Sequence, residues 1–123
     1  MKKKVLIVED EVILLNALMK KFHKEGFLVM GEKNGKLGLD RALKDKPDLI
    51  LLDIIMPVMD GMTMLAKLRR DGWGKNVPVI MLTNLNSSED VTEAAKHGAY
   101  DYLVKSDWRL EDVIGKVNEA LSK

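Results

Sequence analysis

The stretch Pro47-Asp48-Leu49-Ile50-Leu51-Leu52-Asp53 decides the fold of this chain. It holds four consecutive apolar residues between a proline-aspartate pair and a second aspartate, which is the length of a strand rather than of a helix. Because every position of the run is apolar, both faces of the strand must be buried, as they are in the centre of a parallel sheet. This stretch therefore predicts a central parallel strand with helices packed on both sides.

Four further runs of strand length flank this one along the chain. They are Val5–Val8, Phe27–Met30, Val79–Leu82 and Tyr100–Val104. The segments between the runs have helical periodicity, which is clearest after the fifth run, where one face carries Leu110, Val113, Ile114, Val117 and Leu121. Strands and helices thus alternate through the whole chain, which predicts an α/β fold with a doubly wound, five-stranded parallel sheet.

The second and fifth runs are less apolar than the others and predict the edges of the sheet. Asp101 stands between two tyrosines in the fifth run, and the second run continues into Gly31-Glu32-Lys33. Three glycines follow helical segments at positions where a left-handed cap ends a helix, and they are Gly26, Gly72 and Gly98.

The composition restricts the classes of function. A chain of 123 residues that is 46% hydrophobic and 32% charged fits one domain over residues 1–123, with no output domain in this chain. Twenty basic and nineteen acidic residues give a net charge of +1, which argues against direct binding of nucleic acid. The chain has no cysteine. No apolar stretch is close to the length of about 20 residues that a membrane-spanning helix needs. We expect a cytoplasmic protein with no membrane partner.

Polar residues follow the apolar runs at the positions where the strands end. Glu9 and Asp10 follow the first run, Asp53 the third, Thr83 the fourth and Lys105 the fifth. The carboxyl ends of parallel strands lie at one edge of the sheet, where open α/β sheets bind their ligands. His23 and His97 fall late in helical segments, away from this edge.

Three carboxylates at one place repel one another unless a cation joins them or some are protonated. Oxygen ligands without histidine or cysteine favour Mg²⁺, with Mn²⁺ as a substitute. A lysine and a hydroxyl complete a set that holds phosphoryl oxygens, and Asp53 is the nucleophile that we expect to attack phosphorus. The alternative is that these acidic residues cap helices, which suits Asp10 or Asp60 but explains neither Thr83 nor Lys105.

The chain resembles the response-regulator receiver domain of two-component signalling from about Lys4 to Leu121. The matching motifs are Val5–Glu11, Pro47–Asp53 with Met56-Pro57 and Asp60-Gly61, Pro78–Thr83 and Gly98–Lys105. Each motif is weak alone, but their order and spacing together are specific. The resemblance implies a flavodoxin-like (βα)5 fold with strand order 2-1-3-4-5.

The resemblance also implies the role of each site residue. Asp53 would accept a phosphoryl group from a phosphohistidine of a sensor kinase or histidine phosphotransfer protein. Mg²⁺ would be held by Asp10, Asp53 and the backbone carbonyl of Ile55, with Glu9 acting through water.

The resemblance further implies that Thr83 and Lys105 contact the phosphoryl oxygens. Thr83 and Tyr102 would form the switch, because in such domains the threonine moves toward the phosphoryl group and the aromatic ring turns inward. This movement would change the face formed by the fourth helix, fifth strand and fifth helix. The protein would catalyse its own phosphorylation and dephosphorylation without being a turnover enzyme. We expect a monomer or weak homodimer, and the sequence does not identify the downstream effector.

Several residues depart from the family pattern or leave alternatives open. Ser106 replaces the usual proline after the lysine, so a trans peptide or a strained cis bond is expected there. Asn84 follows the switch threonine, where a small residue is usual, and the apolar Ile55 and Leu85 flank the site, which suggests slow self-dephosphorylation.

The alternative function is a pseudo-receiver that keeps the fold as an interaction scaffold without phosphorylation, and Asn84 and Ser106 keep this alternative open. An exposed Ile13 on the first helix is a candidate contact for the kinase.

Overall fold

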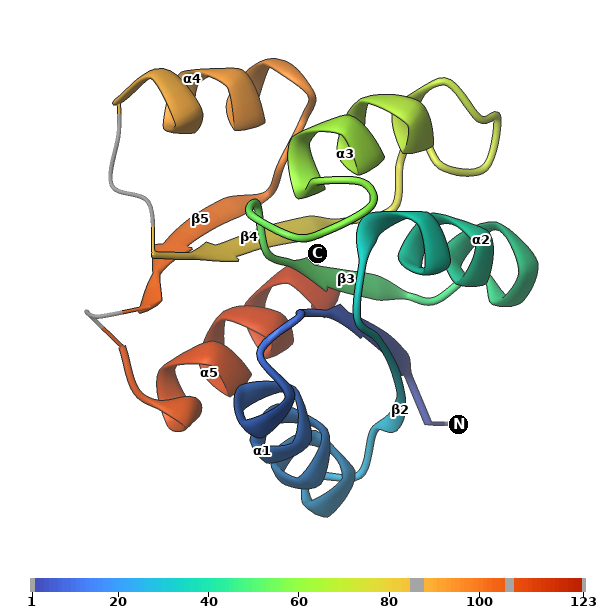
Figure 1. Cartoon of the computed structure of the whole chain (residues 1–123). Helices are drawn as coiled ribbons and strands as arrows, with labels where there is room; N and C mark the ends of the chain where they lie inside the picture. Colours follow the sequence, from blue (N-terminus) through green and yellow to red (C-terminus); the bar gives the residue numbers. More distant parts are fainter. Residues whose placement is uncertain (1, 85–87, 106–107, 123) are drawn as a thin grey trace.

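We describe a computed structural model of the chain, which defines residues 2–84, 88–105 and 108–122 (Figure 1). Its elements alternate as the sequence predicts. The strands are β1 (Lys4–Val8), β2 (Leu28–Glu32), β3 (Leu49–Leu52), β4 (Val79–Thr83) and β5 (Asp101–Val104). The helices are α1 (Val12–Lys24), α2 (Gly35–Asp45), α3 (Gly61–Arg69), α4 (Ser88–Lys96) and α5 (Leu110–Leu121). No helix within the described ranges is both long and apolar enough to cross a lipid bilayer.

All strand pairs are parallel, and the sheet order is β2-β1-β3-β4-β5, which confirms the predicted fold and strand order. The chain begins near the middle of the sheet, moves to the β2 edge and then crosses β1 to reach β3. The strand order therefore reverses between β1 and β3, which places a ligand crevice at the carboxyl ends of these two central strands.

The three central strands are buried on both faces, and their side chains alternate between two cores. In β3, Ile50 and Leu52 face one core and Leu49 and Leu51 face the other. The first core is covered by α2, α3 and α4, and the second by α1 and α5 (Figure 1). Uninterrupted burial of β3 explains why its sequence is apolar at every position.

The edge strands and helix ends agree with the sequence in most places and correct it in two. Every residue of β5 and all but the exposed first residue of β2 are half-buried, as edge strands should be. Gly26 and Gly98 have positive φ angles of 95° and 75°, as left-handed caps require. Gly72 does not, because α3 already ends at Arg69 and a series of turns follows. The second strand begins at Leu28, where its pairing with Lys4 of β1 starts, and the ring of the buried Phe27 before it lies with its centroid 5.3 Å from that of Phe22 of α1.

Arg69 joins the end of α3 to the turn that follows α4. Its guanidinium donates hydrogen bonds to the backbone carbonyls of His97 at 2.8 Å and Gly98 at 3.0 Å. It also donates to the carbonyls of Gly74 at 2.7 Å and Val77 at 2.8 Å, in the segment that leads into β4. One side chain thus fixes the carboxyl-terminal end of α4 against the rest of the domain.

Candidate functional site

Glu9, Asp10 and Asp53 meet at the carboxyl edge of the sheet, where the strand order reverses. Glu9 and Asp10 directly follow β1, and Asp53 directly follows β3. The backbone N–H of Asp53 donates to the carbonyl of Val8 at 3.0 Å, so the two strand ends are held side by side. One carboxylate oxygen from each of the three residues lies within 4.8 Å of the others. The sequence predicted this convergence, and the geometry of the three carboxylates agrees with it.

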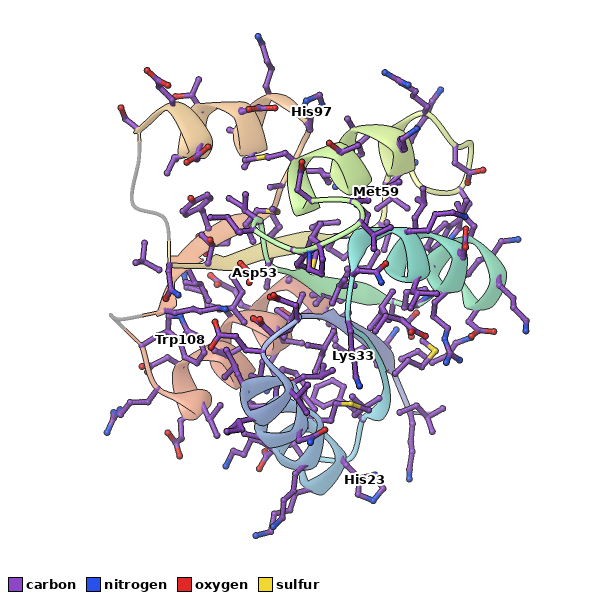
Figure 2. The ribbon with its side chains drawn as sticks, in the orientation of Figure 1. His23, Lys33, Asp53, Met59, His97 and Trp108 are labelled. Carbon is purple, nitrogen blue, oxygen red and sulfur yellow. The ribbon has the colours of Figure 1, made fainter. Side chains whose placement is uncertain are left out.

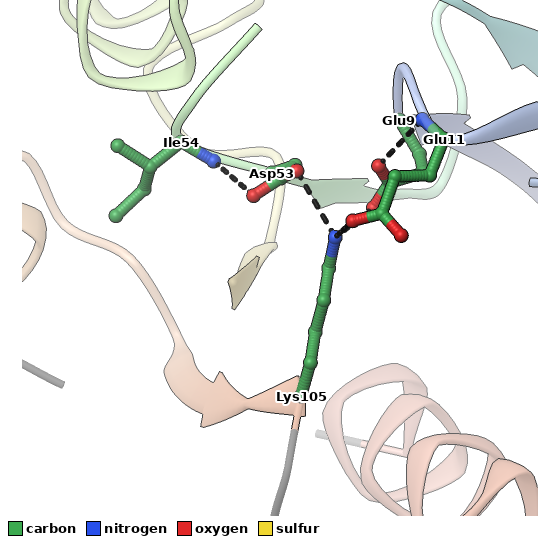
Figure 3. Close-up of polar contacts among 5 residues, drawn as sticks. All are labelled: Glu9, Glu11, Asp53, Ile54 and Lys105. Carbon is green, nitrogen blue, oxygen red and sulfur yellow. Dashed lines mark hydrogen bonds and ion pairs between the residues drawn. The ribbon is translucent and has the colours of Figure 1, made fainter. Parts of the chain in front are cut away.

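Lys105, directly after β5, reaches the same carboxylates (Figure 3). Its Nζ lies 2.6 Å from Glu9 Oε1, 3.1 Å from Asp53 Oδ2 and 3.0 Å from Glu11 Oε1. The lysine side chain is only 7% exposed, and burial by itself lowers the pKa of the ammonium. The three carboxylates outweigh that effect and raise its pKa above the ordinary value, so Lys105 is fully charged at neutral pH.

Both oxygens of the buried Glu9 carboxylate have partners. Its Oε2 accepts a hydrogen bond from the Glu11 N–H at 2.9 Å, and its Oε1 forms the 2.6 Å ion pair with Lys105. Burial raises the pKa of Glu9 to about 7, and the charge of Asp53 adds to the rise, while Lys105 and the Glu11 N–H oppose it.

These observations show that the donor set fits a divalent cation such as Mg²⁺. It consists of oxygens from three carboxylates that lie within 4.8 Å of one another, and Mg²⁺ prefers oxygen ligands of this kind. Neither histidine belongs to the set. Figure 2 shows His23 and His97 away from Asp53, at the carboxyl-terminal ends of α1 and α4.

Asp53 is positioned by the backbone around it. Its Oδ1 accepts a hydrogen bond from the Ile54 N–H at 2.7 Å, and Oδ2 faces Lys105 (Figure 3). The Gly61 N–H donates to the Ile54 carbonyl at 2.7 Å, which closes the loop between β3 and α3 on itself. A Cβ on Gly61 would lie 1.9 Å from the Asp53 carbonyl oxygen, so only glycine allows this close approach.

Thr83 and Tyr102 lie on the two strands β4 and β5, next to the core under α3 and α4. Thr83 is the buried last residue of β4, and it pairs in register with Val104, the residue before Lys105. Side chains alternate along a strand, so Thr83 shares the face of Met81, which belongs to the core under α3 and α4. Tyr102 packs on that same core.

The remaining predicted positions have mixed outcomes. Ile55 lies in the loop after β3 with 63% of its side chain exposed, and its role as a carbonyl ligand stays a prediction. Asn84 is exposed directly after Thr83. Leu85 and Ser106 lie outside the described residues, and so do the expectations attached to them.

The helix-capping alternative applies to Asp60 and not to Asp10. Asp60 is the N-cap of α3 and accepts a hydrogen bond from the Thr63 N–H at 2.8 Å. The N-cap of α1 is Glu11, whose side chain makes no capping bond and instead reaches Lys105. Sequence reasoning missed this contact of Glu11. Its position beside the acidic pair was a signal, but 94 residues separate it from its partner.

Comparisons with known proteins agree with this geometry. The sequence matches the response regulator receiver domain family over residues 5–118. It is 32% identical over 120 residues to the DNA-binding dual master transcriptional regulator RpaA of Synechocystis, covering 98% of this chain and 49% of RpaA. It is 37% identical over 123 residues to a protein-glutamate methylesterase/protein-glutamine glutaminase of Archaeoglobus fulgidus, covering 98% of this chain and 34% of the relative. This chain thus spans about half the length of these relatives or less.

Solved structures give the same result. A CheY-like receiver domain protein from Methanospirillum hungatei superposes with a TM-score of 0.93 at 27% identity, covering 99% of this chain and 95% of that one. The receiver domain of the Francisella response regulator 1452 superposes with a TM-score of 0.90 at 31% identity, covering 98% of both chains. Sequence, fold and the acidic edge of the sheet agree, and the chain belongs to the response regulator receiver domain family.

Proposed function

We propose that this domain is a phosphorylation-dependent signalling switch that accepts a phosphoryl group on Asp53. One observation carries the proposal: the buried ammonium of Lys105 lies 3.1 Å from Asp53 Oδ2, beside a cluster of three carboxylates. Lysine is the cation that phosphoryl-transfer sites use to neutralise charge. The family that the chain belongs to supports the same function.

The transfer follows from the chemistry of these groups. A carboxylate oxygen of Asp53 attacks the phosphorus of a phosphohistidine, and a P–O bond forms as the P–N bond breaks. The electron pair of the broken bond stays on the imidazole nitrogen, which takes up a proton. The product is an acyl phosphate on Asp53. Lys105 and the hydroxyl of Thr83 then contact the phosphoryl oxygens, and Lys105 neutralises part of their charge.

Mg²⁺, when bound by Asp10, Asp53 and the Ile55 carbonyl with Glu9 through water, supplies positive charge to the transferred group, and Mn²⁺ can substitute. The acidic residues themselves hold this position with oxygens no more than 4.8 Å apart. Glu9 and Asp53 are buried and Asp10 is more exposed, and the mutual repulsion of the three carboxylates supports the assignment of a divalent cation to the cluster.

The switch itself follows from the position of Thr83. When a phosphoryl group on Asp53 attracts the Thr83 hydroxyl, the end of β4 moves with it, and β4 leads into α4. Ala94 is the only buried residue in the described part of α4, and a groove of about 690 Å³ separates Glu93 from α3. Such light packing favours a helix that can shift while Arg69 holds its far end. Tyr102, on the same core as Thr83, then changes the face formed by α4, β5 and α5.

The partner that supplies the phosphoryl group is a histidine kinase or a histidine phosphotransfer protein. A decisive experiment incubates the chain with a phosphorylated histidine phosphotransfer protein and Mg²⁺ and records the intact mass. We expect the mass of one phosphoryl group to be added, and Asp53→Asn to abolish the addition. The matched control Asp40→Asn removes an exposed carboxylate on α2 that pairs with Lys36, and it should be phosphorylated normally.

Phosphorylation of Asp53→Asn to the same extent as the unchanged protein would remove Asp53 from the role of acceptor. Failure of the unchanged protein to gain mass from any phosphohistidine or acyl phosphate donor would favour the scaffold function instead.

A further inference from the structure

The contact between Glu11 and Lys105 is not needed to assemble the acidic cluster. Glu11 Oε1 lies 3.0 Å from Lys105 Nζ, and the side chain of this glutamate, the N-cap of α1, is 54% exposed (Figure 3). The Glu11 N–H bonds to Glu9 Oε2, so its backbone is fixed to the cluster while its carboxylate reaches outward. Lys105 therefore has one partner outside the pair of buried carboxylates that it bridges.

The Lys105 ammonium competes with a metal ion for the carboxylates of the acidic cluster. Its Nζ lies close to Glu9 Oε1 and Asp53 Oδ2 at once, so the ammonium occupies the space between two of the three carboxylates that fit a divalent cation. A divalent cation held by the same carboxylates would repel the ammonium. Entry of Mg²⁺ thus requires that the ammonium move away from Asp53, and the move costs less if another carboxylate already holds the lysine.

We propose that Glu11 is a positioning residue that holds Lys105 when Mg²⁺ enters the acidic cluster. This inference rests on the proposed function, because it concerns the same metal site. Glu11 affects binding only through the difference between its contacts with Lys105 before and after the metal enters. That contact strengthens when Asp53 no longer shares the ammonium, so Glu11 favours the metal-bound state.

The expected effect is modest and measurable. Glu11→Gln keeps the size of the side chain and removes its charge. We expect the affinity for Mg²⁺ to fall about threefold to fivefold, which is the size typical of an ion pair with one exposed partner.

A double-mutant cycle separates this mechanism from a general effect of charge. Isothermal titration with MgCl₂ is carried out on the whole chain as four proteins: unchanged, Glu11→Gln, Lys105→Met and the double variant. If Glu11 acts through the lysine, Glu11→Gln should change the affinity by less than about 1.5-fold when Lys105 is already replaced. The control Glu111→Gln removes an exposed charge from the first turn of α5, at the same edge of the sheet, and should leave the affinity unchanged.

An equal loss of affinity in both lysine backgrounds would overturn the proposal, because the charge of Glu11 would then act on the metal directly. An unchanged affinity in Glu11→Gln would overturn it as well. If the unchanged protein binds no Mg²⁺, both this inference and the proposed function fail, whereas the other two results leave the proposed function intact.

A structural measurement covers the case in which Lys105→Met does not fold. In a crystal structure of the unchanged protein with Mg²⁺, Lys105 Nζ should stay within hydrogen-bond distance of the Glu11 carboxylate. The same Nζ should lie more than 4.0 Å from Asp53 Oδ2, which is too far for an ion pair. A lysine that leaves Glu11 or remains on Asp53 in that structure would contradict the proposal.

Discussion

Replacing Gly61 by alanine should displace the proposed acceptor without touching its side chain. The added Cβ would lie 1.9 Å from the Asp53 carbonyl oxygen and 2.8 Å from its carbonyl carbon, and real Cβ atoms essentially never approach closer than 3.0 Å. The oxygen must therefore retreat by about 1.1 Å to reach 3.0 Å. Both sides of this contact are backbone, so no flexible side chain can absorb the shift.

The displacement should be visible in stability and in chemistry. Overpacking of this kind lowers the free energy of unfolding by about 1–3 kcal/mol, which urea unfolding measures. A reacting group that is misplaced by about 1 Å loses about 100-fold in rate, so phosphorylation by acetyl phosphate with Mg²⁺ should slow to that extent.

Gly115 provides the matched control, because it lies inside α5 and a Cβ there meets nothing within 4 Å. Gly115→Ala should raise the free energy of unfolding by about 0.5–1 kcal/mol and leave the phosphorylation rate unchanged. If Gly61→Ala is phosphorylated at the rate of the unchanged protein, the loop does not position Asp53 as described.

Three further predictions concern single side chains. Val58 has a φ of 68° and is 80% exposed, so Val58→Asn should raise the free energy of unfolding by about 1 kcal/mol in urea titrations, and a fall would contradict the strain. Ile13 is 88% exposed on α1, so Ile13→Glu should slow transfer from a histidine kinase but not from acetyl phosphate, and equal slowing of both reactions would exclude docking there. Burial, with the charges of Asp90 and Asp53, raises the pKa of Tyr102 above its ordinary value of 10.0. The unfolded chain then releases this proton first, so stability should fall as the pH rises above 10.0, and a fall of the same size in Tyr102→Phe would contradict the assignment.

The sheet and its strand ends could be predicted because local sequence carries them. The apolar runs of β1, β3 and β4 are buried at nearly every position, and the first polar residue after each run lies at the same edge. Gly72 shows the limit, since a glycine after a helix has many possible conformations, and α3 already ends at Arg69, whose guanidinium bonds to the carbonyls of Gly74 and Val77.

The site was predictable in its members but not in its contacts. Parallel strands bring Glu9, Asp53 and Lys105 together regardless of side-chain detail. Which carboxylates pair with Lys105 depends on how exposed each carboxylate is and on how far its side chain extends. Local sequence does not encode these two properties. For this reason the contact with Glu11 came only from the structure.

The most direct test of the account identifies the phosphorylated residue chemically. The protein is incubated with a phosphohistidine donor and Mg²⁺, reduced with borohydride to convert an acyl phosphate into homoserine, digested and sequenced by mass spectrometry. The account predicts that homoserine replaces Asp53 and appears at no other aspartate. Homoserine at a different position, or none in a protein that still gains phosphate, would contradict it.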